Sequence, residues 1–257
     1  MKYLKKFNQH LNYSNYLTNN SYNQIINEDK DDIVSYCLNE NEVHYDISPF
    51  INGHEYIEIG GKKWATMNIG ATSVTDYGFY FQWGDTQGYT ASQVGSGEGQ
   101  KYFGWEDYKY GNGTSSPGDT GMTKYNSIDG KTVLEASDDA AAASWGGQWR
   151  MPTKDEYVAL GNAVNTAWTT NYLESGVNGL LCTDKTDSSK VLFFPACSLY
   201  LNDIVYGVGR YCYYWSSSLS SSNIQKAFIL YFFDGGNINW QENGYRYSGL
   251  PVRAVAD

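Results

Sequence analysis

The residue types of this chain that could contact a ligand are concentrated in its C-terminal quarter. Eight of the 24 tyrosines fall in the 48-residue window 200–247, where an even spread would place about four or five. They are interspersed with Ser, Asn, Ile and Phe and show no helical period. Tyrosine offers a large, rigid contact at low entropic cost, and Ser, Gly and Asn adapt their hydrogen bonds. A ligand-contacting surface explains this composition, and tyrosines packed in a β-rich core explain it equally well.

Residue types that support catalysis or metal binding are sparse. His10, His44 and His54 are too few and too scattered for a Ser–His–acid triad or a metal cluster. Asp138 and Asp139 could form a catalytic pair, but acidic residues ahead of a run of alanines more often interact with a helix dipole. We therefore predict that the protein is not an enzyme and has no catalytic residues, no metal site and no cofactor.

Cysteine spacing and overall charge narrow the function further. The four cysteines include no CxxC pair, so we expect buried free thiols, with a Cys197–Cys212 or a Cys182–Cys197 disulfide as the alternatives. The net charge of −10 argues against nucleic acid as the main partner, because phosphate binding requires a basic surface. No apolar run reaches about 18 residues, and the basic N-terminus lacks the apolar core of a signal peptide. We expect synthesis in the cytoplasm, with no membrane span.

The chain divides into two regions of different composition, and the second of them carries the tyrosine-rich window 200–247. Residues 1–48 are polar and contain no glycine. We interpret them as an adaptor or oligomerisation segment, because so short a stretch rarely builds a core of its own. Within it, Ile33–Cys37 and Val43–Tyr45 are predicted to pair as strands. Residues 49–257 then form the main domain.

In the main domain, turn and cap residues locate the elements. Gly60-Gly61 predicts a hairpin turn. Asp138-Asp139 ahead of Ala140–Ala143, and a capping box that begins at Thr153, predict two helices. Residues 84–127 are predicted to form a long loop region. The predicted strands are Tyr77–Trp83, Val191–Phe194, Tyr213–Ser217, Ala227–Phe232, Ile238–Trp240 and Pro251–Val255.

Several short stretches together resemble the C-type-lectin-like domain of Bacteroides-type paralogous surface proteins and, more narrowly, the variable proteins of diversity-generating retroelements. In chain order they are GKKWATMNIGAT (61–72), YFQWGDT (80–86), DDAAAASWGGQWRMPTKDEY (138–157), FFPACS (193–198), YYWSSS (213–218), AFILYF (227–232) and GLPVRAV (249–255). The resemblance covers about 60–257. The stretch VSYCLNENEVHYD (34–46) resembles the leader of proteins from gut Bacteroides phages.

This resemblance implies an α+β, C-type-lectin-like fold of the formylglycine-generating-enzyme-like subtype, with two helices, antiparallel sheets and long loops. It also implies a variable region at 198–247, diversified at adenine-bearing codons, whose exposed face binds the ligand. The implied contact residues are Tyr200, Asn202, Tyr206, Tyr211, Tyr213, Ser220, Ser222, Ile229, Tyr231 and Phe233. Trp240, Gln241 and Glu242 are not simple products of such codons, so diversification could stop before them. The EPN-, QPD- and WND-type runs of calcium-dependent sugar binders are absent.

Strand periodicity is compatible with such a face over 227–233. Successive side chains of a strand point to opposite sides. The predicted inward set is Phe228, Leu230 and Phe232, and the predicted outward set is Ile229, Tyr231 and Phe233. Outward apolar side chains that lie together mark an interaction site, unless a second layer covers them. We expect exposure.

The function implied by the resemblance is recognition of a host surface molecule by a phage receptor-binding protein of the virion tail or tail fibre. The implied partners are a host cell-surface protein or glycan, other tail proteins through residues 1–48, and further copies of the chain in a homo-oligomer such as a trimer. Residues 101–110 could form a second contact region or could support the binding face. The alternatives are a bacterial adhesin or lectin at the cell surface, an enzyme related to formylglycine-generating proteins, and a structural virion decoration protein.

Overall fold

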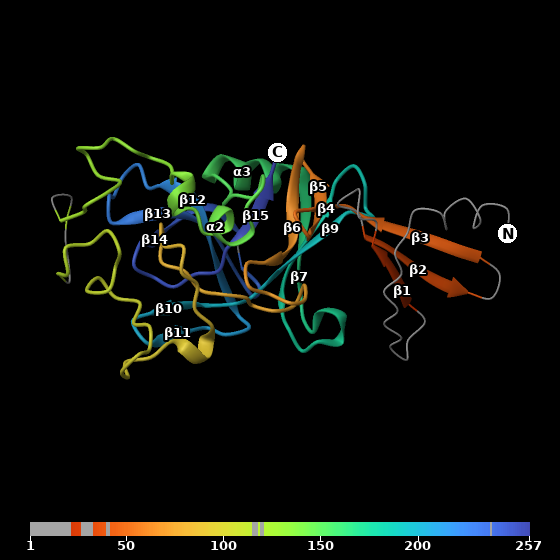
Figure 1. Cartoon of the computed structure of the whole chain (residues 1–257), viewed down its shortest axis with the longest axis horizontal. Helices are drawn as coiled ribbons and strands as arrows, with labels where there is room; N and C mark the ends of the chain where they lie inside the picture. Colours follow the sequence, from red (N-terminus) through yellow and green to blue (C-terminus); the bar gives the residue numbers. More distant parts are fainter. Residues whose placement is uncertain (1–21, 27–32, 40–41, 115–117, 119–120, 237) are drawn as a thin grey trace. The chain divides into compact units, whose positions relative to one another are not determined.

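The computed structural model describes residues 22–26, 33–39, 42–114, 118, 121–236 and 238–257 (Figure 1). The chain divides into two compact units, Met1–Tyr56 and Ile57–Asp257. In the first unit, an antiparallel sheet holds β1 (Tyr22–Ile26), β2 (Ile33–Asn39) and β3 (Glu42–Ser48) in that order. The two strands that the sequence predicts in this segment therefore form and pair.

The described chain after β3 is α+β, with mostly antiparallel sheets. Its strands are β4 (Phe50–Ile51), β5 (His54–Ile59), β6 (Lys62–Asn68), β7 (Val164–Thr169), β8 (Gly179–Asp184), β9 (Val191–Pro195), β10 (Leu199–Leu201), β11 (Ile204–Tyr206), β12 (Tyr211–Leu219), β13 (Lys226–Phe233), β14 (Asn239–Tyr245) and β15 (Arg253–Ala256). They form sheets in the orders β15-β6-β5-β4, β7-β8-β9 and β12-β13-β14, and β10 pairs with β11.

The α-helices found among the described residues are α2 (Ala140–Trp145) and α3 (Lys154–Ala163). Short 3-10 turns lie at η1 (Ala91–Gln93), η2 (Ala136–Asp138) and η3 (Tyr172–Glu174). Within the described part of the chain, the helices are too short or too polar to cross a membrane.

Both helices begin at the cap residues that the sequence predicts. Asp139 caps α2 by accepting hydrogen bonds from the backbone N–H groups of Ala141 and Ala142. Thr153 caps α3 in a capping box with Glu156. The two helices predicted from these motifs are therefore confirmed, as are the strands that correspond to β9, β12, β13, β14 and β15.

The strand predicted at 77–83 is wrong. Tyr80 and Phe81 form only isolated bridges to separate loop residues, so the segment belongs to no sheet. Gly78 and Gly84 have positive φ angles of 73° and 83°, which turn the chain at both ends of this aromatic stretch. Its rings pack in the core, where Tyr80, Phe81 and Trp83 are at most 2% exposed.

One face of the sheet β12-β13-β14 packs onto the core. Tyr214 and Phe232 on this face are at most 1% exposed, and the Tyr214 ring lies 5.0 Å from that of Phe194 on β9. Helix α3 packs on the same sheet, so closely that a Cβ added at Gly161 would lie 2.6 Å from the Trp240 indole. Further residues of the C-terminal part of the chain are also buried, among them Trp215, Ala227, Leu230, Arg246, Val252 and Arg253. Because strand side chains alternate, the other face of β12 and β13 points away from this layer.

An ion pair secures the start of α3. Arg150 donates to both carboxylate oxygens of Glu156, from Nη1 at 2.7 Å and from Nη2 at 2.6 Å. Burial alone would raise the pKa of Glu156, but hydrogen bonds from Arg150 and from Thr153 outweigh burial and lower that pKa from 4.5 to about 2. The group is therefore more acidic in the folded chain than in the unfolded chain, and its ionised form stabilises the fold.

Replacing Glu156 should change how stability depends on pH. The contribution of this carboxylate is complete above pH 4.5 and is lost as the pH falls through about 2; it corresponds to about 3 kcal/mol. We expect Glu156→Gln, which can keep the capping box, to flatten the free energy of unfolding between these two pH values in urea titrations. The matched control is Asp155→Asn, which removes a carboxylate that is 87% exposed on the same turn. Equal flattening by both variants would contradict the assignment.

Candidate ligand-binding site

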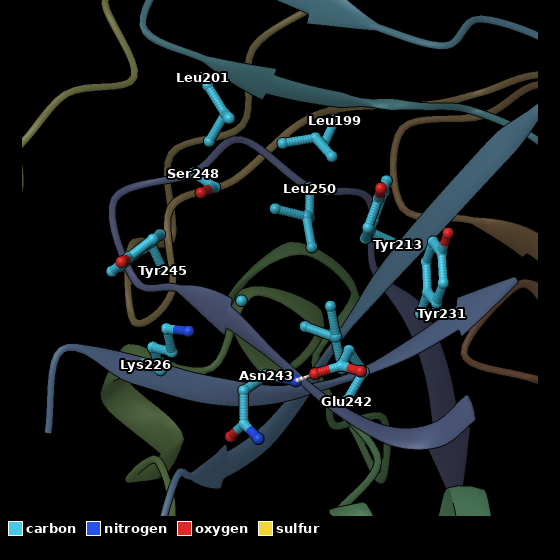
Figure 2. A pocket seen from close by; sticks show the side chains of 12 residues that line it. Leu199, Leu201, Tyr213, Lys226, Tyr231, Glu242, Asn243, Tyr245, Ser248 and Leu250 are labelled. Carbon is cyan, nitrogen blue, oxygen red and sulfur yellow. Dashed lines mark hydrogen bonds between the residues drawn. The ribbon is translucent and has the colours of Figure 1, made fainter. Parts of the chain in front are cut away.

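A cavity of about 280 Å³ lies on the second face of β12-β13-β14, between the sheet, β10 and residues 248–250 (Figure 2). Most of its lining is aliphatic or aromatic: Leu199, Leu201, Tyr213, Ile229, Tyr231, Gly244, Tyr245 and Leu250. The polar residues of the lining are Lys226, Glu242, Asn243 and Ser248. Apolar walls with a few polar groups are typical of small-ligand sites, and this volume is just below their range of about 300–1,000 Å³.

Backbone hydrogen bonds hold the wall of the cavity in place. After β14 the chain crosses the sheet, and Tyr200 and Gly249 exchange N–H···O bonds of 2.9 and 3.0 Å. Further along, the Trp215 N–H donates to Pro251 O at 3.2 Å. These backbone bonds attach the wall to β10 and β12.

A glycine lets the cavity reach down between two strands. Ile229 on β13 lies opposite Trp215 on β12, and both are at most 2% exposed. Gly244 on β14 sits beside them, and a Cβ added there would lie 3.3 Å from atoms of both side chains. A larger residue at this position would crowd the cavity floor.

An aromatic ladder, formed by Tyr211, Tyr213, Tyr231 and Phe233, continues from the cavity along β12 and β13. Tyr213 pairs with Tyr231 across the strands, and their ring centroids lie 4.8 Å apart at 29°. Tyr211 pairs with Phe233 at 5.8 Å, and Tyr231 lies 5.8 Å from Phe233. All four side chains are half-buried. The ladder thus offers ring surface to a ligand while its members support one another.

A tyrosine cluster, formed by Tyr245 and Tyr247 on Trp105, lies at the other side of the cavity. The two tyrosine rings stack with centroids 5.6 Å apart, and the Trp105 ring lies 4.8 Å from that of Tyr247. Tyr245 is 41% exposed, whereas Trp105 is 8% exposed. Burial raises the pKa of Tyr247, and charge interactions with Tyr245, Tyr102 and Tyr206 raise it further. The loop that carries Trp105 thus supports this side of the face.

Two charged groups occupy the cavity, one of each sign. In Figure 2, Glu242 lies on the side of Tyr213 and Tyr231, and Lys226 lies with Tyr245 on the other. The Lys226 Nζ is 4.7 Å from the centroid of the Tyr245 ring. Burial raises the pKa of Tyr231, and the charge of Glu242 adds a smaller increase. Burial likewise raises the pKa of Tyr213. Both hydroxyl groups therefore stay neutral at neutral pH.

The structure brings several sequence-predicted contact residues together. Tyr213 and Tyr231 line the cavity, and Tyr211 and Phe233 extend the same face. Tyr206, at 45% exposure, and Ser222 are also accessible, but neither lines the cavity. Asn202 is half-buried at the β10–β11 turn with a φ of 60°, and its backbone hydrogen-bonds with Phe103.

Two predicted contact residues, Tyr200 and Ser220, are buried and do not line the cavity, and Ile229 lines the cavity but is not exposed as expected. Tyr200 is 7% exposed, and its ring packs edge-on against Tyr80 at 4.8 Å. Ser220 is 5% exposed, and its Oγ accepts a hydrogen bond from Asn223 N at 3.3 Å in the β12–β13 turn. Ile229, predicted to be outward with Tyr231 and Phe233, is on their side of β13 but is 2% exposed. Ile229 lies beside Trp215 and Gly244, whereas Tyr231 is only half-buried.

Sequence reasoning missed much of the cavity lining. The unassigned residues are Leu199, Leu201, Lys226, Glu242, Asn243, Gly244, Tyr245, Ser248 and Leu250. Tyr245 lies within the tyrosine-rich window and could have been found by that signal. The leucines come from segments that meet only in the folded chain, and nothing in their local pattern distinguishes them from core residues.

Groups considered for catalysis have structural roles. Asp138 accepts hydrogen bonds from Lys109, Lys124 and Tyr125, and Asp139 caps α2. In the described part of the chain, no three His, Cys, Asp or Glu side chains are grouped to hold a metal ion. The cysteines for which a disulfide was considered are free and buried: Cys182, Cys197 and Cys212.

Truncating the ladder should cost far less stability than truncating the opposite face. We expect Tyr231→Ser to lower the free energy of unfolding by about 1 kcal/mol, because it removes a half-exposed cross-strand ring. Tyr214→Ser should lower it by about 3–5 kcal/mol, because this ring is fully buried. Urea denaturation of the two variants measures both values. Similar losses would mean that the ladder belongs to the core.

Comparisons with known proteins identify no relative, so the function is argued from the geometry of the cavity and its surroundings. No family model matches the chain, and no curated protein or solved structure matches it either.

Proposed function

We propose that this chain is a ligand-binding protein that uses the cavity, the aromatic ladder and the tyrosine cluster as one recognition surface. The observation that carries the proposal is the asymmetry of β12 and β13. Their core face is buried, and their other face presents half-exposed rings beside a cavity. Aromatic side chains are enriched in protein interfaces and bind with little loss of side-chain entropy.

We propose further that the fold is C-type-lectin-like and that the surface is diversified by a retroelement. Three features support this assignment: the two helices, the mostly antiparallel sheets, and a C-terminal excursion over β10–β14 that forms the candidate surface. In addition, the ladder carries Tyr and Phe, which are among the products of diversified adenine-bearing codons in the family that the sequence resembles. The core-facing neighbours on the same strands include Leu230, whose burial leaves it little freedom to change.

In this proposal the chain is a phage receptor-binding protein of the virion tail, and its ligand is a host surface protein or glycan. Several copies in a homo-oligomer would raise the overall affinity of individually weak sites, because the second contact becomes intramolecular. Residues 1–48 would attach the chain to other tail proteins. The β-sheet of this segment and the cavity belong to different compact units, which suits a division between attachment and recognition.

Deep sequencing of the gene from a natural population tests the proposal. We expect amino-acid changes to concentrate at five accessible positions: Tyr206, Tyr211, Tyr213, Tyr231 and Phe233. The internal controls are core-facing residues of the same two strands: Cys212, Tyr214, Leu230 and Phe232. Changes spread equally over both sets, or mostly silent changes, would overturn the proposal, because neither pattern fits selection on an exposed binding face.

A further inference from the structure

The carboxylate of Glu242 is held firmly but is not neutralised. Its Oε2 accepts a hydrogen bond from Asn239 Nδ2 at 3.0 Å. Its Oε1 accepts one from Asn243 N at 2.8 Å (Figure 2). Among the residues that the structure describes, it forms no ion pair. A carboxylate offers about four lone-pair sites, so about two remain for a ligand. The neighbouring cavity is therefore suited to a cationic hydrogen-bond donor.

The walls around this carboxylate fit a cation that arrives on an aliphatic stem. Tyr213 and Tyr231 lie at the same end of the cavity, and tyrosine rings attract cations through their faces. Leu199 and Leu250 supply apolar surface, against which the methylene groups of a long side chain can pack. The net charge of −10 favours the approach of a cationic ligand.

Lys226 does not neutralise this end of the cavity. The strand register places Lys226 opposite Tyr245 and places Ile229 opposite Glu242. This is a separation of three residues, or about 10 Å along the strand. The Lys226 Nζ instead lies 4.7 Å from the centroid of the Tyr245 ring, so its charge is held at the other end of the cavity.

We propose that the Glu242 end of the cavity binds the guanidinium group of an arginine side chain presented by a protein ligand. Arginine fits better than lysine because its planar group can stack on a tyrosine ring and donate two parallel hydrogen bonds to a carboxylate. The small volume suits one such anchor, around which the ladder and the tyrosine cluster form the rest of the contact. This inference rests on the proposed function and names the ligand class of the same surface.

Titration of the full chain with N-acetyl-arginine amide tests the proposal, and N-acetyl-citrulline amide serves as the neutral probe of nearly the same shape. We expect saturable binding of the arginine probe with a dissociation constant on the order of 1 mM, followed by NMR or calorimetry. The citrulline probe should bind about tenfold more weakly, because it lacks the charge-assisted bonds to Glu242.

Two variants locate the interaction. Glu242→Gln should weaken binding of the arginine probe about tenfold, while its amide oxygen can still accept from Asn239. Lys226→Gln, the matched charge removal at the other end, should leave this affinity unchanged or increase it less than about threefold. A near-UV circular dichroism spectrum like that of the unmodified chain shows that a variant keeps its aromatic packing.

Several outcomes would overturn the inference. They are equal affinity for the two probes, no saturable binding, or a loss of binding in Lys226→Gln but not in Glu242→Gln. The last result would mean that Glu242 does not hold the guanidinium group of the probe. If the arginine probe does not bind but natural variation clusters at the accessible positions, the proposed function stands and only the cation site is lost. Binding of the arginine probe without clustered variation would retain the cation site and remove the diversified surface.

Discussion

The guanidinium group of Arg253 is the constraint on which the main unit depends. It is fully buried. On one side it donates to Asn68 Oδ1 and to the carbonyls of Ala65 and Thr66, and on the other side it donates to the carbonyl of Phe193. None of these four acceptors is a carboxylate. Guanidinium keeps its charge at any physiological pH, and a buried charge is costly unless hydrogen bonds satisfy it. Strands β6, β9 and β15 must therefore stay where these acceptors meet.

A second buried arginine, Arg246, holds the backbone next to the candidate site through hydrogen bonds of the same kind. Arg246 directly follows β14 and donates to Tyr108 Oη and to the carbonyls of Lys124, Tyr125 and Ile224. It ties the long loop region and the β12–β13 turn to one point. Tyr245 and Tyr247 flank it in sequence, so the buried Arg246 side chain fixes the backbone from which both tyrosines project. The tyrosine cluster thus derives its position from a cation beneath it.

Local sequence signals predicted the elements better than they predicted the site. The cap residues Asp139 and Thr153 located both helices, because capping depends on hydrogen bonds within a few residues. The aromatic segment at 77–83 was wrongly predicted as a strand. Its structure is determined by burial of its rings, because its backbone pairs with no strand of the described chain. For Ile229, alternation gave the correct face but not its burial. That depends on residues 249–251, whose backbone hydrogen-bonds with β10 at Gly249 and with β12 at Pro251.

The aromatic ladder has a consequence for how the surface can change. Tyr231 touches the rings of Tyr211, Tyr213 and Phe233, so one substitution there leaves three neighbours to find new rotamers. Side chains in mutual contact couple in free energy, and their effects do not add. The four positions therefore act as a combinatorial unit, in which a given residue can favour one ligand or another depending on the other three. The variety of shapes available to such a surface grows with combinations of residues and exceeds what single substitutions would suggest.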